Sequence, residues 1–240
     1  MKKISLLDNF TQFFDKLFPT YCIVCKKEWE GWLCKNCKKK LISHPEICPI
    51  CHKPSVFGQV CLHCQLTNPN FPLKGIMILF SYNQIIKKLI LALKYYHIKD
   101  TSKFLAQRMA NYLLTNKNID LSNVAISYVP THWKRKIFQK WYNQSFQLAK
   151  NLAEILNLPL LNLCKKRTNT KSQLSLSRKE RLYNLKNVFS PITSNIEQET
   201  IIIVDDLTTT WTTLKEVANC IKNINQDIEI RWLVVARHNI

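Results

Sequence analysis

The stretch that decides the fold is IIIVDDLTTTWTTL, residues 201–214. Apolar residues lead into Asp205 and Asp206, and a hydroxyl-rich loop then runs into the expected start of a helix. Two carboxylates at the end of a buried strand can accept hydrogen bonds from paired ribose hydroxyls, or help to hold a metal ion bound to a sugar phosphate. Backbone N–H groups and hydroxyls at a helix N-terminus suit a phosphate. The pattern predicts a phosphosugar pocket, because helix capping by Asp206 and a threonine would explain only part of it.

Strands and helices alternate on either side of this stretch. Apolar, β-prone segments predict strands, and segments with helical periodicity predict helices. The strands are expected at residues 75–83, 124–130, 200–206 and 229–237, and the helices at 84–96, 101–114, 143–156 and 213–223. Thr101 or Ser102 is the expected cap of the second helix. Nearly continuous apolar strands that alternate with helices predict an α/β fold with a parallel sheet covered on both faces, and ligands of such folds lie at the carboxyl ends of the strands.

Residues 164–191 break this alternation, because the stretch is long, polar and basic. A loop of that length inside a compact domain is usually functional or disordered. We interpret the stretch as a mobile lid, since it lies between elements that would border the pocket. A solvated linker is the alternative interpretation.

Eight of the ten cysteines form four Cys-x-x-Cys pairs within residues 22–64. Each pair lets two thiolates from one tight turn bind one metal ion, and a second pair completes the tetrahedron. Four sulfur ligands make a closed, structural zinc site, so two such sites are expected. The simplest pairing is sequential, with Cys22, Cys25, Cys34 and Cys37 in one site and Cys48, Cys51, Cys61 and Cys64 in the other, and a crossed pairing stays open. Cys164 and Cys220 stand alone in apolar surroundings and are expected in the core.

The cysteine-rich part is expected to form a domain of its own. Residues 65–75 contain two prolines and are interpreted as a linker, which places a double zinc-ribbon domain with an N-terminal helix at 1–68 and the α/β domain at 69–240. Asp8 and Asp15 interrupt the N-terminal apolar stretch, which argues against a signal peptide. No apolar run reaches the ~18 residues of a membrane helix. We therefore expect a cytoplasmic protein, in which a disulfide framework is disfavoured.

The net charge of +19 is concentrated in the middle of the chain. Residues 71–195 carry 21 basic and 4 acidic side chains. A polyanion such as nucleic acid is the natural partner of so basic a segment. The chain is also rich in Lys, Asn and Ile, and an AT-rich genome would favour lysine without any such partner.

The loop VDDLTTTWTTL resembles the phosphoribosyl-pyrophosphate loop of type I phosphoribosyltransferases. Four further stretches narrow the resemblance when they are taken with the Cys-x-x-Cys pairs. They are LFPTYC (17–22), LKYY (93–96), VPTHWKRKIFQKWYNQ (129–144) and KRTNTKSQLSLSRKERLYNLKNVF (166–189). Together these motifs resemble the ComF family, whose members combine a double zinc ribbon with a parallel-sheet, type I phosphoribosyltransferase-like domain. The resemblance spans nearly the whole chain and implies that architecture for it.

The resemblance also implies roles for the residues that match the family's motifs. Asp205, Asp206 and Lys94 are the implied catalytic residues, with the carboxylates on the ribose and the lysine near pyrophosphate. Phosphoribosyl pyrophosphate, with Mg²⁺, would be held by the 5′-phosphate cradle, the pyrophosphate loop, an Asn-Gln signature and the lid-like stretch. The cradle corresponds to Thr209, Thr210, Thr212 and Thr213, and the pyrophosphate loop to Val129 and Pro130. The Asn-Gln signature is Asn143 and Gln144. The lid-like stretch contributes Arg167, Gln173, Arg181 and Asn184.

Two tryptophans depart from the family pattern. Trp211 occupies the glycine position of the phosphate loop, and Trp141 occupies the glycine position of the signature. Glycine is needed where backbone must approach a ligand or adopt a positive φ, so an indole at 211 would crowd the 5′-phosphate and puts transfer in doubt. Some bacteria decode UGA as glycine, whereas other code tables read it as Trp. Under that hypothesis both residues are glycine in the cell, and Trp32 and Trp232 are open to the same explanation. UGG codons at 141 and 211 would exclude it.

The ComF family is tied to natural transformation, the uptake of single-stranded DNA. The resemblance therefore implies a protein that handles single-stranded DNA. The basic middle segment would supply phosphate contacts, and the aromatics of THWKRKIFQKWYNQ (131–144) would stack on bases. The alternative is an active Mg²⁺-dependent phosphoribosyltransferase that transfers ribose 5-phosphate to an unidentified acceptor. In a third interpretation the zinc ribbons recruit other competence proteins, such as a competence helicase.

Overall fold

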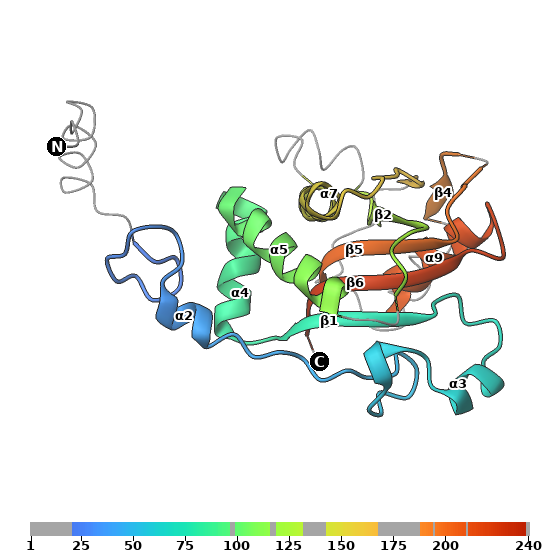
Figure 1. Ribbon diagram of the computed structural model, residues 1–240, viewed down its shortest axis with the longest axis horizontal. Helices are drawn as coiled ribbons and strands as arrows, with labels where there is room; N and C mark the ends of the chain where they lie inside the picture. The colour runs from blue at the N-terminus through green and yellow to red at the C-terminus, as the bar shows by residue number, and fades with distance from the viewer. Residues whose placement is uncertain are drawn as a thin grey trace.

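The central sheet has four parallel strands. The computed structural model describes residues 21–96, 99–115, 119–131, 143–167, 188–193, 195–209 and 211–238. The strands are β1 (Gly75–Ser81), β2 (Val124–Tyr128), β5 (Thr200–Thr208) and β6 (Glu229–Arg237). Their order across the sheet is β1-β6-β5-β2, and every neighbouring pair is parallel (Figure 1). The expected parallel sheet is confirmed. Its strands are buried on both faces, which explains the continuous apolar runs in the sequence.

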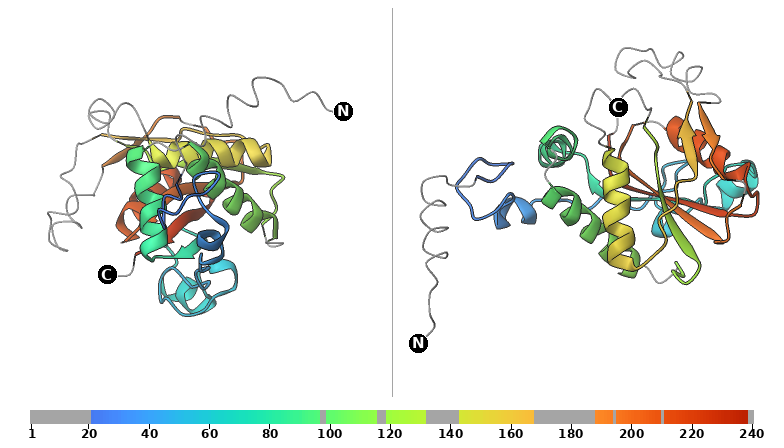
Figure 2. Two further views of the ribbon diagram at one scale, coloured as in Figure 1. Left: turned by 90° about the vertical axis from the view of Figure 1, so that its left-hand side faces the viewer. Right: turned by 90° about the horizontal axis from the view of Figure 1, so that it is seen from above.

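Helices cover both faces of this sheet (Figures 1 and 2). One face carries α4 (Gln84–Leu91), its π-helical continuation η2 (Ala92–Tyr96), α5 (Lys99–Thr115) and α7 (Gln144–Leu156), and the other carries α9 (Trp211–Lys222). Alternate strand residues serve the two faces. Ile202 and Val204 of β5 belong to the core under α4, α5 and α7, whereas Ile201 and Ile203 belong to the core under α9.

The start of α5 differs from the expectation. The expected cap at Thr101 or Ser102 is wrong, because the helix already runs from Lys99 and both residues are buried inside it. Ser102 Oγ accepts a hydrogen bond from Asn151 Nδ2 of α7 at 2.8 Å. Packing between two helices, and not capping, therefore accounts for this serine.

Residues 164–191 do not form one continuous loop. β3 (Cys164–Lys166) and β4 (Phe189–Pro191) pair antiparallel at the two ends of the stretch and join the core under α9. Residues 168–187, which are most of the stretch interpreted as a lid, lie outside the described residues, so the lid stays a prediction. Cys164 lies beside Cys220 of α9 with their Sγ atoms 3.1 Å apart, and both are buried core residues as expected.

The cysteine-rich part follows the outer edge of β1 (Figures 1 and 2). It contains α2 (Lys35–Lys39), the 3₁₀ turn η1 (Val56–Gly58) and α3 (Leu62–Thr67). Two isolated bridges, Ser43 to Phe80 and Gln59 to Gly75, attach it to β1. Such a cover satisfies an edge strand that would otherwise present unpaired backbone groups. The N-terminal helix expected within residues 1–20 lies outside the described residues.

Glycine is required where this part meets the sheet. Gly58 has a φ of +63°, and a Cβ there would lie 1.8 Å from the carbonyl oxygen of Ile76. Residues 65–75, interpreted as a linker, are tied to the sheet, because the N–H of Lys74 donates to the carbonyl oxygen of Ile230 at 2.8 Å. The domain boundary at residue 68 stays a prediction.

Candidate active site and metal centres

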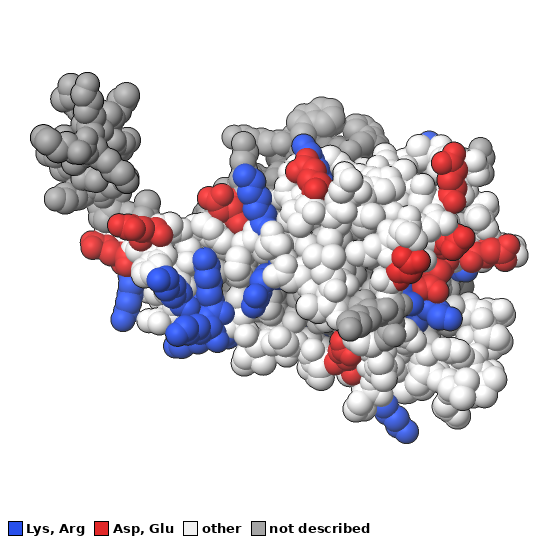
Figure 3. Space-filling model, viewed as in Figure 1, with Lys and Arg blue, Asp and Glu red and all other residues white. Residues whose placement is uncertain are grey.

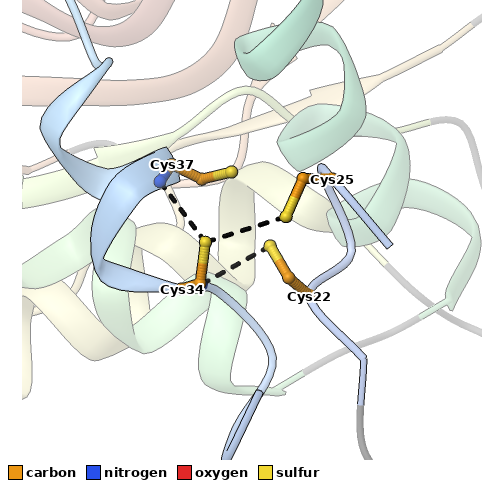
Figure 4. A group of neighbouring side chains, drawn as sticks. All are labelled: Cys22, Cys25, Cys34 and Cys37. Carbon is orange, nitrogen blue, oxygen red and sulfur yellow. Dashed lines mark hydrogen bonds between the residues drawn. The ribbon is translucent and has the colours of Figure 1, made fainter. Parts of the chain in front are cut away.

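Eight cysteines gather into two clusters. Within each cluster the four Sγ atoms lie within 4.8 Å of one another. The clusters contain Cys22, Cys25, Cys34 and Cys37, and Cys48, Cys51, Cys61 and Cys64. Figure 4 shows the first set, with its sulfurs pointing toward a common centre. The sequential pairing is therefore the one that the fold adopts, and the crossed pairing is not.

The two clusters are built by the same local fold. In each, the residue after the first Cys-x-x-Cys pair lies in the left-handed region, with a φ of 60° at both Lys26 and His52. Its N–H donates to the carbonyl oxygen of the pair's first cysteine, which is Cys22 (2.9 Å) or Cys48 (3.0 Å). This turn brings the two sulfurs of a pair to one metal, as the spacing predicts.

The sulfur geometry fits zinc. A tetrahedral site with Zn–S distances of about 2.3 Å separates its sulfurs by about 3.8 Å. The Sγ atoms of Cys25 and Cys34 are 3.8 Å apart, as are those of Cys51 and Cys61. Burial raises the pKa of the Cys22 thiol, but hydrogen bonds from nearby backbone N–H groups outweigh it and lower the pKa to about 6. The thiolate that zinc needs is thereby favoured at Cys22, whereas burial and the neighbouring thiols raise the pKa of Cys37 to about 12. Four sulfur ligands leave no open position for catalysis.

The acidic pair lies near the carboxyl end of β5. Asp205 and Asp206 are 9% and 7% exposed. Asp205 Oδ1 accepts hydrogen bonds from Ser145 Oγ of α7 at 2.7 Å and from the N–H of Asp206 at 2.9 Å. Lys94 Nζ of η2 lies 2.8 Å from Asp206 Oδ2. The three residues that the resemblance made catalytic therefore meet at one place, and Ser145 joins them.

Sequence reasoning missed Ser145. A single serine in a helix carries no signal, and its contact with Asp205 exists only because the first turn of α7 lies against β5. The neighbouring Asn-Gln signature gave the only pointer to this turn.

Asn143 holds that turn in place. It is the N-cap of α7, since its Oδ1 accepts a hydrogen bond from the N–H of Phe146 at 3.2 Å. Its Nδ2 donates to the carbonyl oxygen of Val129 at 3.2 Å, just past the end of β2. Pro130 follows, and Gln144 is the first residue of the helix. Asn143 thus ties the expected pyrophosphate loop to the helix that carries Ser145.

The hydroxyl-rich loop is short. β5 ends at Thr208 and α9 begins at Trp211, so only two residues separate strand from helix. Thr212 and Thr213 lie half-buried in the first turn of α9, and Thr209 lies in the connection. Unsatisfied N–H groups at such a junction suit a phosphate.

Of the lid residues, Arg167 alone belongs to the part of the chain that the structure describes, and its recorded contacts do not include the acidic pair. Arg167 directly follows β3, where its N–H donates to the carbonyl oxygen of Val188 at 2.7 Å, and its charge acts on Cys220 on the α9 side of the sheet. Thr210, Gln173, Arg181, Asn184 and Trp141 lie outside the described residues.

Two parts of the chain match models of known protein families. Residues 13–65 match the model of a double zinc ribbon domain, and residues 143–240 match that of a phosphoribosyl transferase domain. The chain thus contains a segment similar to double zinc ribbons and a segment similar to phosphoribosyl transferase domains. These matches confirm the expected fold class and, with the relatives below, the resemblance to the ComF family.

Three curated relatives match most of this chain and most of their own length. Competence protein F of Haemophilus influenzae is 28% identical over 91% of this chain and 98% of its own length. Competence protein ComFC of Bacillus subtilis is 25% identical over 78% of this chain and 75% of its own. DNA utilization protein YhgH of Escherichia coli is 26% identical over 83% of this chain and 89% of its own length.

The matched phosphoribosyltransferase domain does not contain the whole site. Asp205, Asp206, Ser145 and Asn143 lie within residues 143–240, whereas Lys94 comes from η2, which lies before the matched range.

Among the described residues, no helix is both long and apolar enough to cross a membrane.

Asp205 carries an unusual ionisation. Burial and the neighbouring Asp206 carboxylate raise its pKa to about 7, against the opposing effects of the Ser145 hydrogen bond and the Lys94 charge. The folded protein therefore holds one more proton than the unfolded chain between about pH 4 and pH 7, so it loses stability as the pH rises through that window.

Replacing Asp205 by asparagine is expected to remove this loss. The amide oxygen of Asn can accept the same two hydrogen bonds without a charge. We expect the unfolding free energy of Asp205→Asn to match the wild type near pH 4 and to exceed it by on the order of 3 kcal/mol at pH 8. Urea unfolding at both pH values measures the difference. An advantage of equal size at both would contradict the assignment.

Proposed function

We propose that the protein is a cytoplasmic ComF-type protein that binds phosphoribosyl pyrophosphate with Mg²⁺ and handles single-stranded DNA in natural transformation. The main support for a phosphosugar pocket is the Lys94–Asp206 ion pair of 2.8 Å. It lies beside Asp205 and close to the junction between β5 and α9. A cation and two carboxylates near the carboxyl end of a parallel strand are what this class of ligand requires.

Each group suits one part of the ligand. Asp205 and Asp206 can accept hydrogen bonds from the ribose hydroxyls, and carboxylate oxygens are the donors that Mg²⁺ prefers. The first turn of α9 offers N–H groups to the 5′-phosphate. The Lys94 ammonium can turn from Asp206 to the pyrophosphate oxygens and stabilise their charge. The protein's residues thus bind and orient the sugar phosphate.

Calorimetry with phosphoribosyl pyrophosphate and Mg²⁺ tests this pocket. We expect heat of binding from the Trp211→Gly variant, and a dissociation constant about tenfold or more higher when Lys94→Ala is added, because a hydrogen bond to a charged group is lost. Lys87→Ala, an exposed lysine of α4, is the matched control and is expected to leave affinity unchanged. If neither the wild type nor Trp211→Gly gives heat, the domain is a scaffold and the pocket proposal fails.

The DNA part of the proposal is supported by the relatives and by charge. The relatives are named for competence and DNA utilization, and residues 71–195 carry 21 basic against 4 acidic side chains. Recruitment of a competence helicase or another competence protein by the zinc ribbons would fit the same setting.

The alternative function is transfer of ribose 5-phosphate to an acceptor. What favours it is the position of Lys94, whose cation can stabilise charge on departing pyrophosphate. Release of pyrophosphate that depends on an added acceptor would establish this function, and binding without release would favour the DNA-handling one.

A further inference from the structure

Exposed lysines gather on the first zinc ribbon. Lys35, Lys38, Lys39 and Lys40 are all exposed on α2 and at its end. Figure 3 shows blue side chains clustered over this part of the molecule, with acidic side chains at the margin of the cluster. Glu28 and Glu30 of the same ribbon are exposed as well. The sequence placed the basic footprint in residues 71–195, so this cluster is a finding of the structure.

The lysine cluster borders an aromatic pair. Lys38 Nζ lies 5.6 Å from the centroid of the Phe104 ring of α5. Phe104 and Trp32 meet edge to face with their centroids 5.5 Å apart, and both rings are only half-buried. One turn further along α5, Arg108 is exposed and adds another cation. We call these seven residues, Trp32, Lys35, Lys38, Lys39, Lys40, Phe104 and Arg108, the ribbon face.

The first zinc site holds this face rigid. α2 has five residues, which is too short for a helix that is stable alone. Cys34 caps its start by accepting a hydrogen bond from the N–H of Cys37, and both cysteines belong to the first cluster. The metal site therefore fixes the backbone that carries the four lysines.

We propose that the ribbon face binds single-stranded DNA, with its lysines on consecutive phosphates and the Phe104 ring under a base. This inference rests on the proposed function and assigns a surface to it. Single strands fit better than a duplex, because a ring among cations can stack on an unpaired base, whereas the bases of a duplex are already stacked. The ribbon of this protein thus joins metal binding to nucleic-acid binding.

The test measures the binding of fluorescent oligothymidylate by anisotropy at several salt concentrations. In Lys35→Gln/Lys39→Gln/Lys40→Gln, three phosphate contacts are lost. The slope of log K against log salt is then expected to shrink by about 2, and affinity at 0.1 M salt to fall about 100-fold. Lys53→Gln/Lys215→Gln removes two charges from exposed positions outside both the ribbon face and residues 71–195, and it is expected to change the slope and the affinity much less.

A second variant separates stacking from charge. Phe104→Leu keeps an apolar side chain of similar size on α5 and removes the ring. We expect it to weaken oligothymidylate binding about tenfold and to leave weak duplex binding unchanged, since stacking requires an unpaired base. Zinc content of two ions per chain in each variant shows that the ribbon is intact.

The outcomes distinguish this inference from the function on which it rests. If the wild type binds oligothymidylate and the triple variant keeps its slope, DNA binds elsewhere, and the inference is overturned while the function stands. If the wild type does not bind at all at low salt, both fail. If the triple variant loses binding to phosphatidylserine vesicles but not to oligothymidylate, the face is a membrane contact and the inference is wrong.

Discussion

Replacing Cys25 by serine is expected to reduce the zinc content from two ions per chain to one and to loosen α4. Cys25 is the exposed member of the first cluster, so the change removes a ligand with little loss of packing. Changes behind zinc ligands already cost 10- to 100-fold in metal affinity, and loss of a ligand is expected to cost roughly 100-fold or more. Competition with a chelator measures the affinity of each site.

The loss is expected to spread because the first zinc site shares its core with α4. Cys22, Cys34 and Cys37 belong to the same hydrophobic cluster as Ile86 and Leu89. Lys88 Nζ also donates to the carbonyl oxygen of Val24, between the two cysteines of the first pair. Since structural zinc contributes folding energy directly, the melting temperature is expected to fall together with the zinc content.

Cys25→His is the matched control. Imidazole is a zinc ligand, so this variant is expected to keep two ions and most of the stability. Cys51→Ser empties the second site and is expected to loosen the β1 edge, leaving α4 protected from hydrogen exchange. Two ions per chain in Cys25→Ser, or equal exchange of α4 in both serine variants, would show that the first cluster does not support that helix.

Burial explains which parts of the fold were predictable. β6 (Glu229–Arg237) has the predicted bounds, since a strand buried on both faces is a continuous apolar run. β3 (CKK) and β4 (FSP) are three residues each and contain no apolar run, so their pairing is a product of tertiary contacts that no local pattern shows. The cap expected at Thr101 or Ser102 was wrong for the same reason, because packing on α7 decides what that serine does.

The residues of the candidate site also differ in how far the sequence predicts them. Asp205, Asp206 and Lys94 were found through motifs that resemble a family, and the structure brings them together. Ser145 depends on how α7 docks against β5, which one sequence does not reveal. The pairing of the cysteines was also open, because identical Cys-x-x-Cys spacings allow either combination and only the path of the chain chooses between them.

Trp211→Gly is expected to increase the affinity for phosphoribosyl pyrophosphate about 10- to 100-fold. α9 begins at residue 211, and two residues separate it from the end of β5, so this position lies where a 5′-phosphate would meet the N–H groups of the first turn. Crowding of a closely packed site by a bulky side chain costs about 1–3 kcal/mol, which corresponds to that range of affinity. Calorimetry with Mg²⁺ present measures it.

A second substitution at the same position separates the effect of side-chain bulk from the effect of backbone conformation. Trp211→Ala removes the indole but keeps a Cβ, so it is expected to recover the part of the affinity that crowding alone removes. Any further gain in Trp211→Gly then reports a backbone conformation or a close approach that only glycine permits. Equal and weak binding by all three proteins would show that the loop does not cradle a phosphate.

The result also bears on the identity of the residue in the cell. If glycine at 211 restores binding that tryptophan abolishes, the loop has kept its threonines and acidic pair for a ligand that the written sequence excludes. Retention of a whole pocket around one disabling residue is hard to explain by loss of function, because the other residues would have been free to change as well. A UGA codon at 211 read as glycine removes the contradiction, and the mass of the tryptic peptide from the native protein decides it. A peptide mass with tryptophan at 211 would place the protein among those that keep this fold without its phosphosugar.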